Sequence, residues 1–288
     1  MLETNNHIFK HYKTIFMDRG NMVLPRLDYA RVAHFIAARL RQYFEASGRK
    51  VGVIGLSGGV DSSVVAYLTM MALGRDRTRL YLLPSSVTPS EDMEDAMSIV
   101  EKLEIPDGNW RVISIDEIVE AFERKLGQMS RVGRGNIMAR IRMTILYHEA
   151  AANNGLVIGS GDKSEYLSGY FTKHGDGGAD VLPLVGLYKT HVRQLAEYLK
   201  IPERIWVKPP SPALWPGQTA EEELGVDYAT LDTVLYLRFD KKLSEEAINR
   251  VSGIPLETVE RILERVRLTR HKRRLPKRFT IDYDKMSV

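Results

Sequence analysis

The sequence predicts an α/β fold: a doubly wound, mostly parallel sheet with helices on both faces, followed by C-terminal helices. Three observations predict it. The sequence contains short apolar runs that are rich in β-branched residues, and these runs alternate with helical patterns. In addition, glycine-rich or polar segments follow directly after the runs. Strands that alternate with helices favour a parallel sheet with right-handed crossovers. Ligands of such sheets bind beyond the carboxyl ends of the strands, so functional residues are expected there.

The apolar runs lack a polar alternate face, as strands do when they are buried on both sides. Strands are expected at residues 51–56, 80–83, 110–115 and 156–160. Helices are expected at residues 28–48, 60–73, 88–103, 116–126, 136–152 and 190–199. Asp28 is the expected N-cap of the first helix. Thr88-Pro89-Ser90-Glu91 has the form of a capping box with proline at the first helical position.

Length and composition are those of an ordinary globular protein, with 288 residues, 44% hydrophobic and 27% charged. No apolar run approaches the roughly 20 residues that a membrane-spanning helix needs. The N-terminus is acidic and polar where a signal peptide has a basic start and an apolar core, so a cytoplasmic location is expected. We expect one domain over residues 1–288, with a helical C-terminal extension from about residue 219.

The sequence contains no cysteine. Disulfides, thiolate metal sites and thiol nucleophiles are therefore excluded. An enzyme with this sequence has to use oxygen, nitrogen, backbone or metal chemistry.

The formal net charge of +4 is concentrated near the C-terminus. Residues 261–278 contain nine basic residues and one acid, which leaves 32 basic and 36 acidic residues elsewhere. Two helices expected at 243–253 and 255–270 resemble a helix-turn-helix that ends in the basic run HKRRLPKR. The segment either binds nucleic acid or closes over an active site and brings its basic end to ligand phosphates. We favour the second interpretation and expect no nucleic-acid partner, because basic tails are weak evidence of specific contact.

The segment GLSGGVDSS, from Gly55 to Ser63, joins the first strand to its helix and has the composition of a pyrophosphate-binding loop. Its glycines allow close backbone approach, and the helix N-terminus offers unpaired N–H groups. The hydroxyls of Ser57, Ser62 and Ser63 can donate to phosphate oxygens. The loop has neither the lysine of a P-loop nor the GxGxxG spacing. Since an aspartate here would repel phosphate unless a cation bridged them, Asp61 is interpreted as a Mg²⁺ ligand. The alternative is a plain turn with Asp61 as a first-turn helix acid.

A second polar stretch follows the fourth expected strand. It reads GSGDKSE over residues 159–165 and continues as GYFTKHGDGGAD over residues 169–180. Three glycines within four residues argue against a helix, and the interleaved Lys, His and Asp favour a loop that folds over a charged ligand. A solvent-exposed loop is the alternative.

SGGVDSS matches the signature of the ATP pyrophosphatase group, and GNIMARIRM with GYFTKHGDGGADVLPL resembles the NAD synthetase family. The segments LYK at 187–189, PSP at 210–212 and HK at 271–272 fall at family positions, so the resemblance covers about residues 27–279. It implies an adenine nucleotide alpha hydrolase-like fold. It also implies a ligase that amidates deamido-NAD with ammonia through a substrate adenylate, giving NAD, AMP and pyrophosphate in the final step of NAD biosynthesis.

The resemblance implies three sets of contacts. ATP contacts are implied for Gly55, Leu56, Ser57, Gly58, Gly59, Val60, Asp61, Ser62, Ser160, Lys189 and Ser211. Deamido-NAD contacts are implied for Arg140, Lys173, Asp180, His271 and Lys272. Mg²⁺ is the implied cofactor, with Asp61 and Glu165 as its ligands.

Several of these residues also have a plain structural interpretation. Arg140 and the nearby Arg142 could be solvated helix charges. Lys173 and Lys189 taken alone would be ordinary surface lysines, and Glu165 could be the first-turn acid of a short helix. All five roles stay open on the sequence alone.

The sequence departs from the family pattern in two places. The family often has threonine where this chain has Ser160 and Ser211, and since serine keeps the hydroxyl, binding is expected to survive. After the Pro-Ser-Pro segment the family often has an acidic residue, whereas this chain has Ala213-Leu214. The local geometry at that point is therefore open.

The missing cysteine also bears on the nitrogen donor. Some family members have an N-terminal glutaminase domain with a cysteine nucleophile, but here the first expected core helix begins at Asp28. No glutaminase domain is expected, so free ammonia, or ammonia from a separate glutaminase, is the implied donor. The family usually forms homodimers with substrate near the interface. Because an acyl adenylate hydrolyses readily, the loop at 169–180 is expected to be a lid that is disordered without ligands.

Overall fold

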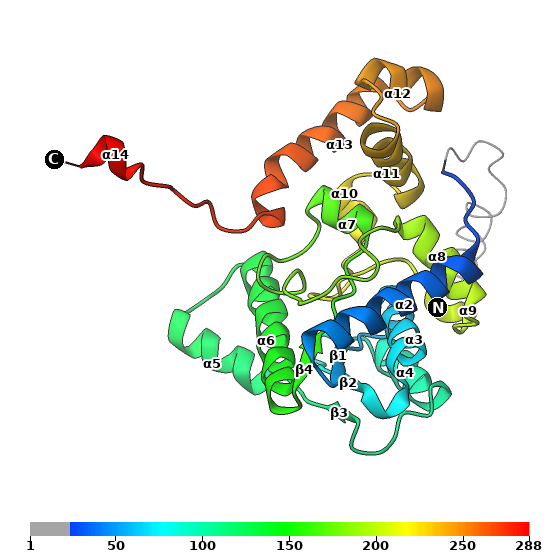
Figure 1. Ribbon diagram of the computed structural model, residues 1–288, viewed down its shortest axis with the longest axis vertical. Helices are drawn as coiled ribbons and strands as arrows, with labels where there is room; N and C mark the ends of the chain where they lie inside the picture. The colour runs from blue at the N-terminus through cyan, green and yellow to red at the C-terminus, as the bar shows by residue number, and fades with distance from the viewer. Residues whose placement is uncertain (1–23, 288) are drawn as a thin grey trace.

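The computed structural model describes residues 24–287 and contains one four-stranded parallel sheet (Figure 1). Residues 1–23, where we expect no signal peptide, lie outside the described residues. The strands are β1 (Val51–Gly55), β2 (Thr78–Leu82), β3 (Trp110–Val112) and β4 (Gly155–Val157), in the order β3-β2-β1-β4. The chain adds strands on one side of β1 and then returns to its other side. The topological switch point, where ligands of such sheets bind, therefore lies between β1 and β4.

Alternate side chains of β1 enter two different cores, as the period of two along a strand requires. Ile54 packs into a core that involves α2 (Tyr29–Ser47), α3 (Val60–Leu73), α4 (Ser90–Lys102) and α8 (Lys189–Tyr198). Val51 and Val53 pack into a core that involves α5 (Asp116–Leu126) and α6 (Arg131–Ala152). Figure 1 shows these two helical layers on opposite sides of the sheet. The predicted doubly wound α/β fold is confirmed.

Most expected elements are present, and the differences lie at their ends. Asp28 is confirmed as the N-cap of α2, where its carboxylate accepts the Arg31 N–H at 3.0 Å. The capping box expected at Thr88 is wrong: Pro89 is the N-cap of α4, and the Thr88 hydroxyl instead accepts the Ser85 N–H at 2.9 Å. Because proline supplies no side-chain acceptor, this helix begins without a side-chain cap.

α6 begins five residues earlier than expected. Ser130 is its N-cap and accepts the Gly133 N–H at 3.1 Å, so Gly133 and Gly135, which precede the expected start, lie in the first turns. Gly135 allows close packing there, because a Cβ would lie 3.1 Å from Leu214 side-chain atoms and would require them to shift. Packing against another segment, which the sequence pattern does not contain, overrides the low helix propensity of glycine.

The C-terminal part of the chain has its own apolar cluster, which also receives Tyr188 from the start of α8. Its helices are α10 (Ala220–Leu224), α11 (Tyr228–Leu235), α12 (Glu245–Ser252) and α13 (Leu256–Leu268), with a π-helical turn over Tyr236–Asp240. The pair expected at 243–253 and 255–270 is α12 and α13. α13 packs against α7 (Lys163–Ser168) and α11, so it is part of the body of the protein.

Short elements complete the chain: 3₁₀ turns at Arg75–Arg77 and Thr269–Arg273, α9 (Glu203–Trp206) and α14 (Tyr283–Met286). The segment that leads to α14 runs away from the body (Figure 1). Among the described helices, none has the length and apolar character required to cross a bilayer.

Candidate active site

A cleft of about 550 Å³ opens beyond the carboxyl ends of β1 and β4, at the switch point of the sheet. Its walls are the loop after β1, the residues after β4, one side of α6, the segment 169–178 and the segment 208–218. Segments from all parts of the described chain therefore meet at the position that the topology predicts.

The structure brings most of the sequence-predicted residues together. Those that line the cleft are Gly55, Leu56, Ser57, Gly59, Val60, Asp61, Ser62, Ser160, Glu165, Lys189, Ser211 and Lys272. Those outside its lining are Gly58, Arg140, Lys173, Asp180 and His271. All but one of the candidate ATP and metal residues thus share one cavity, whereas four of the five candidate deamido-NAD residues do not line it.

The conformation of the loop after β1 requires glycine at position 58. Its φ is +82°, and a Cβ there would lie 2.0 Å from the Asp92 carbonyl oxygen, so only glycine fits. The hydroxyls of Ser57 and Ser62 are 3.0 Å apart and face the cleft. Ser63, which we expected to donate to phosphate, is fully buried and donates to the Gly59 carbonyl at 2.8 Å instead. The loop therefore presents backbone N–H groups and two hydroxyls to an anion.

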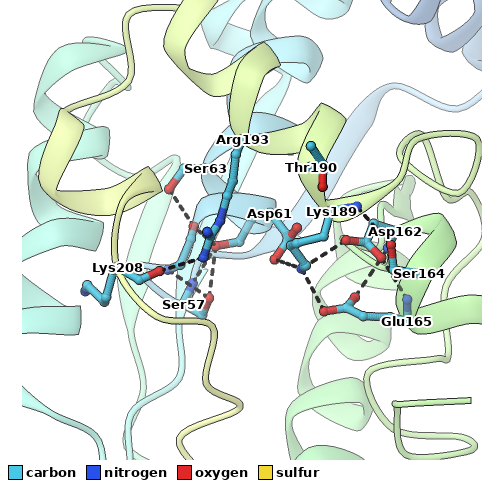
Figure 2. A network of polar contacts seen from close by, with 12 residues as sticks. Ser57, Asp61, Ser63, Asp162, Ser164, Glu165, Lys189, Thr190, Arg193 and Lys208 are labelled. Atoms are coloured by element: carbon cyan, nitrogen blue, oxygen red, sulfur yellow. Dashed lines mark hydrogen bonds and ion pairs between the residues drawn. The ribbon is translucent and has the colours of Figure 1, made fainter. Parts of the chain in front are cut away.

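Lys189, the first residue of α8, occupies the centre of the site (Figure 2). Its side chain is fully buried, and its Nζ lies 2.7 Å from Asp61 Oδ2, 3.0 Å from Asp162 Oδ2 and 2.9 Å from Glu165 Oε1. Asp61 lies in the first turn of α3, directly after the loop that follows β1, while the other two carboxylates follow β4. One ammonium group thus joins the two loops on either side of the switch point.

Burial and charge act against each other in this cluster. Burial disfavours the charged ammonium, but the three carboxylates outweigh it and raise the pKa of Lys189 well above its usual value. Burial raises the pKa of Asp162 to about 7 although Lys189 acts in the opposite direction, and it raises the pKa of Glu165 well above its usual value. Three carboxylates share one ammonium, and the raised pKa values of Asp162 and Glu165 show that the cluster holds its negative charge at a cost that a further cation would relieve.

The cluster fits a divalent cation that is also bound by phosphate. Asp61 Oδ1 is buried and has no hydrogen-bond partner among the described residues. No group of three or more His, Asp or Glu side chains in the described part of the chain is arranged to hold a metal ion by itself. Mg²⁺ commonly binds through one or two carboxylates together with substrate phosphates. Asp61 and Glu165 supply that number of ligands.

Asp162 is a member of the cluster that the sequence analysis did not assign. It is the N-cap of α7: its Oδ1 accepts the Glu165 N–H at 2.8 Å, and Glu165 Oε2 accepts the Asp162 N–H at 3.3 Å. Glu165 is therefore the first-turn acid of a short helix and also forms an ion pair with Lys189. The spacing of Asp and Glu three residues apart was the available signal.

Asp232 on α11 was also missed, and it positions Lys189 through the backbone. The Asp232 carboxylate accepts the Thr190 N–H at 2.9 Å and the Ser164 hydroxyl, and that hydroxyl accepts the Lys189 N–H at 2.9 Å. The first turn of α8 has no side-chain cap of its own, so these contacts satisfy two of its free N–H groups. Burial raises the pKa of Asp232 to about 6, against the effect of its hydrogen bonds.

A second charged cluster lies on the other side of the phosphate loop. Lys208 Nζ lies 2.7 Å from Asp92 Oδ1 and 2.5 Å from Asp95 Oδ2, and Arg204 Nε lies 2.6 Å from Asp95 Oδ1. The buried Arg193 donates to the Lys208 carbonyl at 3.0 Å (Figure 2). The segment that contains Ser211 is thereby attached to α4 and α8.

The C-terminal residues hold the glycine-rich loop from its other side. Lys272 Nζ donates to the carbonyls of Gly169 and Phe171 at 2.8 and 2.7 Å, and Arg265 Nε donates to the Ser168 carbonyl at 3.2 Å. Arg273 donates to the Tyr166 carbonyl at 3.3 Å. Part of the basic run is therefore turned toward the cleft wall, as the interpretation of a closing helical pair requires.

Three of the candidate deamido-NAD residues outside the cleft lie on α6 or contact it. Arg140 is exposed on α6, and its Nη2 donates to the Lys173 carbonyl at 3.3 Å. The Asp180 carboxylate accepts the Val157 N–H at 2.7 Å, and the hydroxyl of Tyr147 on α6 donates to it at 3.4 Å.

The fold and the site define the class: a doubly wound α/β protein with the SGGVDSS loop and an acidic cluster at its switch point, as in the ATP pyrophosphatases. The sequence profile of the NAD synthase family matches residues 32–276. The NH(3)-dependent NAD(+) synthetase of Saccharolobus solfataricus is 49% identical over 255 residues, which cover 88% of this chain and 91% of the relative. That of Sulfolobus acidocaldarius is 46% identical with the same coverage. The chain belongs to the NAD synthase family.

Solved structures agree with this result. The NMN synthetase of Francisella tularensis matches with a TM-score of 0.78 and 35% identity, covering 89% of this chain and 100% of that one. The NH3-dependent NAD synthetase of Campylobacter jejuni matches with a TM-score of 0.75 and 27% identity, covering 88% and 100%.

We predict that Lys189→Met destabilises the protein by about 3–5 kcal/mol, because it leaves three carboxylates together without a cation. Chemical denaturation at neutral pH measures the effect. The control is Lys102→Met, which removes an exposed lysine from α4 and should change the free energy of unfolding by less than about 0.5 kcal/mol. A Lys189→Met variant as stable as this control would contradict the central role of the ammonium group.

Proposed function

We propose that this protein catalyses the ATP-dependent amidation of deamido-NAD with ammonia, giving NAD, AMP and pyrophosphate. The observation that supports it most directly is the placement of Asp61 and Glu165 within 3 Å of one ammonium group beside the phosphate loop. The substrate carboxylate attacks the α-phosphorus, pyrophosphate leaves, and ammonia then displaces AMP from the acyl adenylate. The named relatives are NH(3)-dependent NAD(+) synthetases, which supports this substrate.

The residues of the cleft have distinct tasks in this reaction. Backbone N–H groups at the start of α3 and the hydroxyls of Ser57 and Ser62 bind the phosphates of ATP. Asp61 and Glu165 would hold Mg²⁺, which neutralises phosphate charge when bound. Lys189 fixes the positions of both carboxylates. The loop 169–180, held by Lys272, keeps water from the adenylate, and we retain the prediction that it orders on ligand binding.

The direct test supplies purified protein with ATP, Mg²⁺, ammonium and deamido-NAD and measures AMP and NAD. A parallel reaction replaces deamido-NAD with its mononucleotide analogue, because one similar structure is described as an NMN synthetase. We expect efficient turnover with deamido-NAD. Folded protein that forms no NAD would contradict the proposed function, and preference for the mononucleotide would change the substrate while keeping the chemistry.

Asp61→Ala is expected to reduce turnover by at least roughly 100-fold, the upper end of the loss seen for groups one step removed from a metal. The protein should stay folded, because Asp61 lies at the cleft surface with a side chain 20% exposed. Asp76→Ala, an exposed aspartate at the opposite edge of the sheet, is the control and should keep wild-type activity. Near-normal turnover of the Asp61 variant would remove this residue from the metal site.

We further propose a homodimer that buries the outer face of α5. Ile118, Phe122 and Leu126 are 39%, 40% and 64% exposed there. α5 packs beside α6, which carries Arg140, so a partner on this face would adjoin candidate deamido-NAD residues that do not line the cleft. Apolar faces of this kind commonly mark protein interfaces.

Phe122→Glu is expected to dissociate the dimer and to raise KM for deamido-NAD more than KM for ATP. Sedimentation gives the molecular mass, and steady-state kinetics give both constants. Phe35→Glu, at a 67% exposed phenylalanine on α2, is the matched control. It should leave the molecular mass and both KM values unchanged. A monomeric wild-type protein, or a dimer that Phe122→Glu leaves intact, would refute this interface.

A further inference from the structure

Five cationic side chains line the cleft, and most of them are already bound by the protein. They are Lys189, Lys208, Lys272, Arg265 and Arg142. The first two neutralise carboxylates, and the next two donate to backbone carbonyls. An anionic substrate therefore finds few cations whose charge and donors are available.

Arg142 on α6 differs from the other four. Its Nε donates to the carbonyl of Leu83, directly after β2, at 2.9 Å. Its Nη1 and Nη2 have no hydrogen-bond or ion-pair partner among the described residues. One side of the guanidinium group is thus fixed to the backbone at the carboxyl edge of the sheet, while both terminal amino groups are available to the cleft.

The surroundings of Arg142 make an arriving anion favourable. Burial lowers the pKa of Arg142 to about 10, while the more distant Asp176 and Asp116 act in the opposite direction. The group stays charged at neutral pH, but it has lost much of its hydration without gaining an ion pair. Neither carboxylate is free to move to it, because Asp176 accepts the Thr172 N–H and Asp116 accepts the Ser86 N–H, both at 2.8 Å.

We propose that Arg142 is a catalytic residue that binds an oxyanion of the reacting centre through its two terminal amino groups. The planar fork of arginine matches the paired oxygens of phosphate and carboxylate. The α-phosphate of ATP and the carboxylate that attacks it are both such groups, and they meet at one point during adenylation. The inference rests on the proposed function and adds to it a binding group for the atoms that react.

The test compares Arg142→Ala with Arg77→Ala. Arg77 is a close match, because its Nε donates to the Lys50 carbonyl at 2.6 Å, at the opposite edge of the sheet. Loss of a donor to a developing oxyanion reduces turnover by about 100- to 1000-fold, and we expect that loss for Arg142→Ala alone. Added guanidinium ion should restore part of the turnover of Arg142→Ala, because it can occupy the space that the arginine side chain leaves in the cleft. It should not raise the turnover of Arg77→Ala, which leaves no such space beside the reacting groups.

Equilibrium binding separates the two oxyanions and does not depend on turnover. AMP supplies the α-phosphate alone, and deamido-NAD supplies the carboxylate. Weaker binding of AMP to Arg142→Ala, by roughly tenfold or more, assigns the phosphate, and the same loss for deamido-NAD assigns the carboxylate. Either result supports the proposal.

Unchanged binding of both ligands with turnover within threefold of wild type would overturn it. A second result would also overturn it: activity of Arg142→Ala that falls only in proportion to the folded protein in thermal melts and that guanidinium ion does not restore. Arg142 would then only attach α6 to the Leu83 carbonyl. Wild-type protein that binds AMP through Arg142 but forms no NAD would contradict the proposed function and the catalytic role of Arg142, and would leave Arg142 only as a phosphate-binding group.

Discussion

The ammonium group of Lys189 is buried among three carboxylates, and much of the site depends on that one arrangement. A buried cation needs anions around it, and these anions come from two loops on opposite sides of the switch point. The contacts therefore fix the loop after β1 relative to the residues after β4. The separation of these two segments sets the width of the cleft. The ion pairs of Lys189 therefore influence both the shape of the cleft and its charge.

The C-terminal helices are connected to the same arrangement. Asp232 on α11 orients the first turn of α8 and thereby the backbone of Lys189, while Ser164 links the two. Further along, Lys272 holds two carbonyls of the glycine-rich loop. The basic C-terminal run that first suggested nucleic-acid binding contributes to the cleft wall. Its local charge is explained in part by carbonyl groups of the protein itself, because a lysine directed at backbone oxygens needs no external anion.

The sequence allowed prediction of the parts that depend on local pattern. Buried strands, the glycine loop at Gly58 and the metal candidate Asp61 follow from residue type and position after a strand, whereas the metal candidate Glu165 came from the family resemblance. The residues that were missed act through long-range contacts. Asp232 is 42 residues from Thr190, and no spacing in the chain indicates that they meet. The early start of α6 was also missed, because the packing of Gly135 against Leu214 is a long-range contact. Arg142 resembled a solvated helix charge until its contact with Leu83 placed it in the cleft.

The charge distribution explains why metal and nucleotide should bind together. Asp61 places a carboxylate in the cleft beside the glycine-serine loop, so phosphate without a cation would be repelled there. A divalent cation alone would find two protein ligands and much open coordination. Bound together, each neutralises the charge that opposes the other, which makes their binding free energies cooperative. Lys189 cannot replace the metal, because its ammonium is already shared among three carboxylates. Arg142 differs from the other cations described in the cleft, because neither of its terminal amino groups contacts a carboxylate or a carbonyl of the described residues.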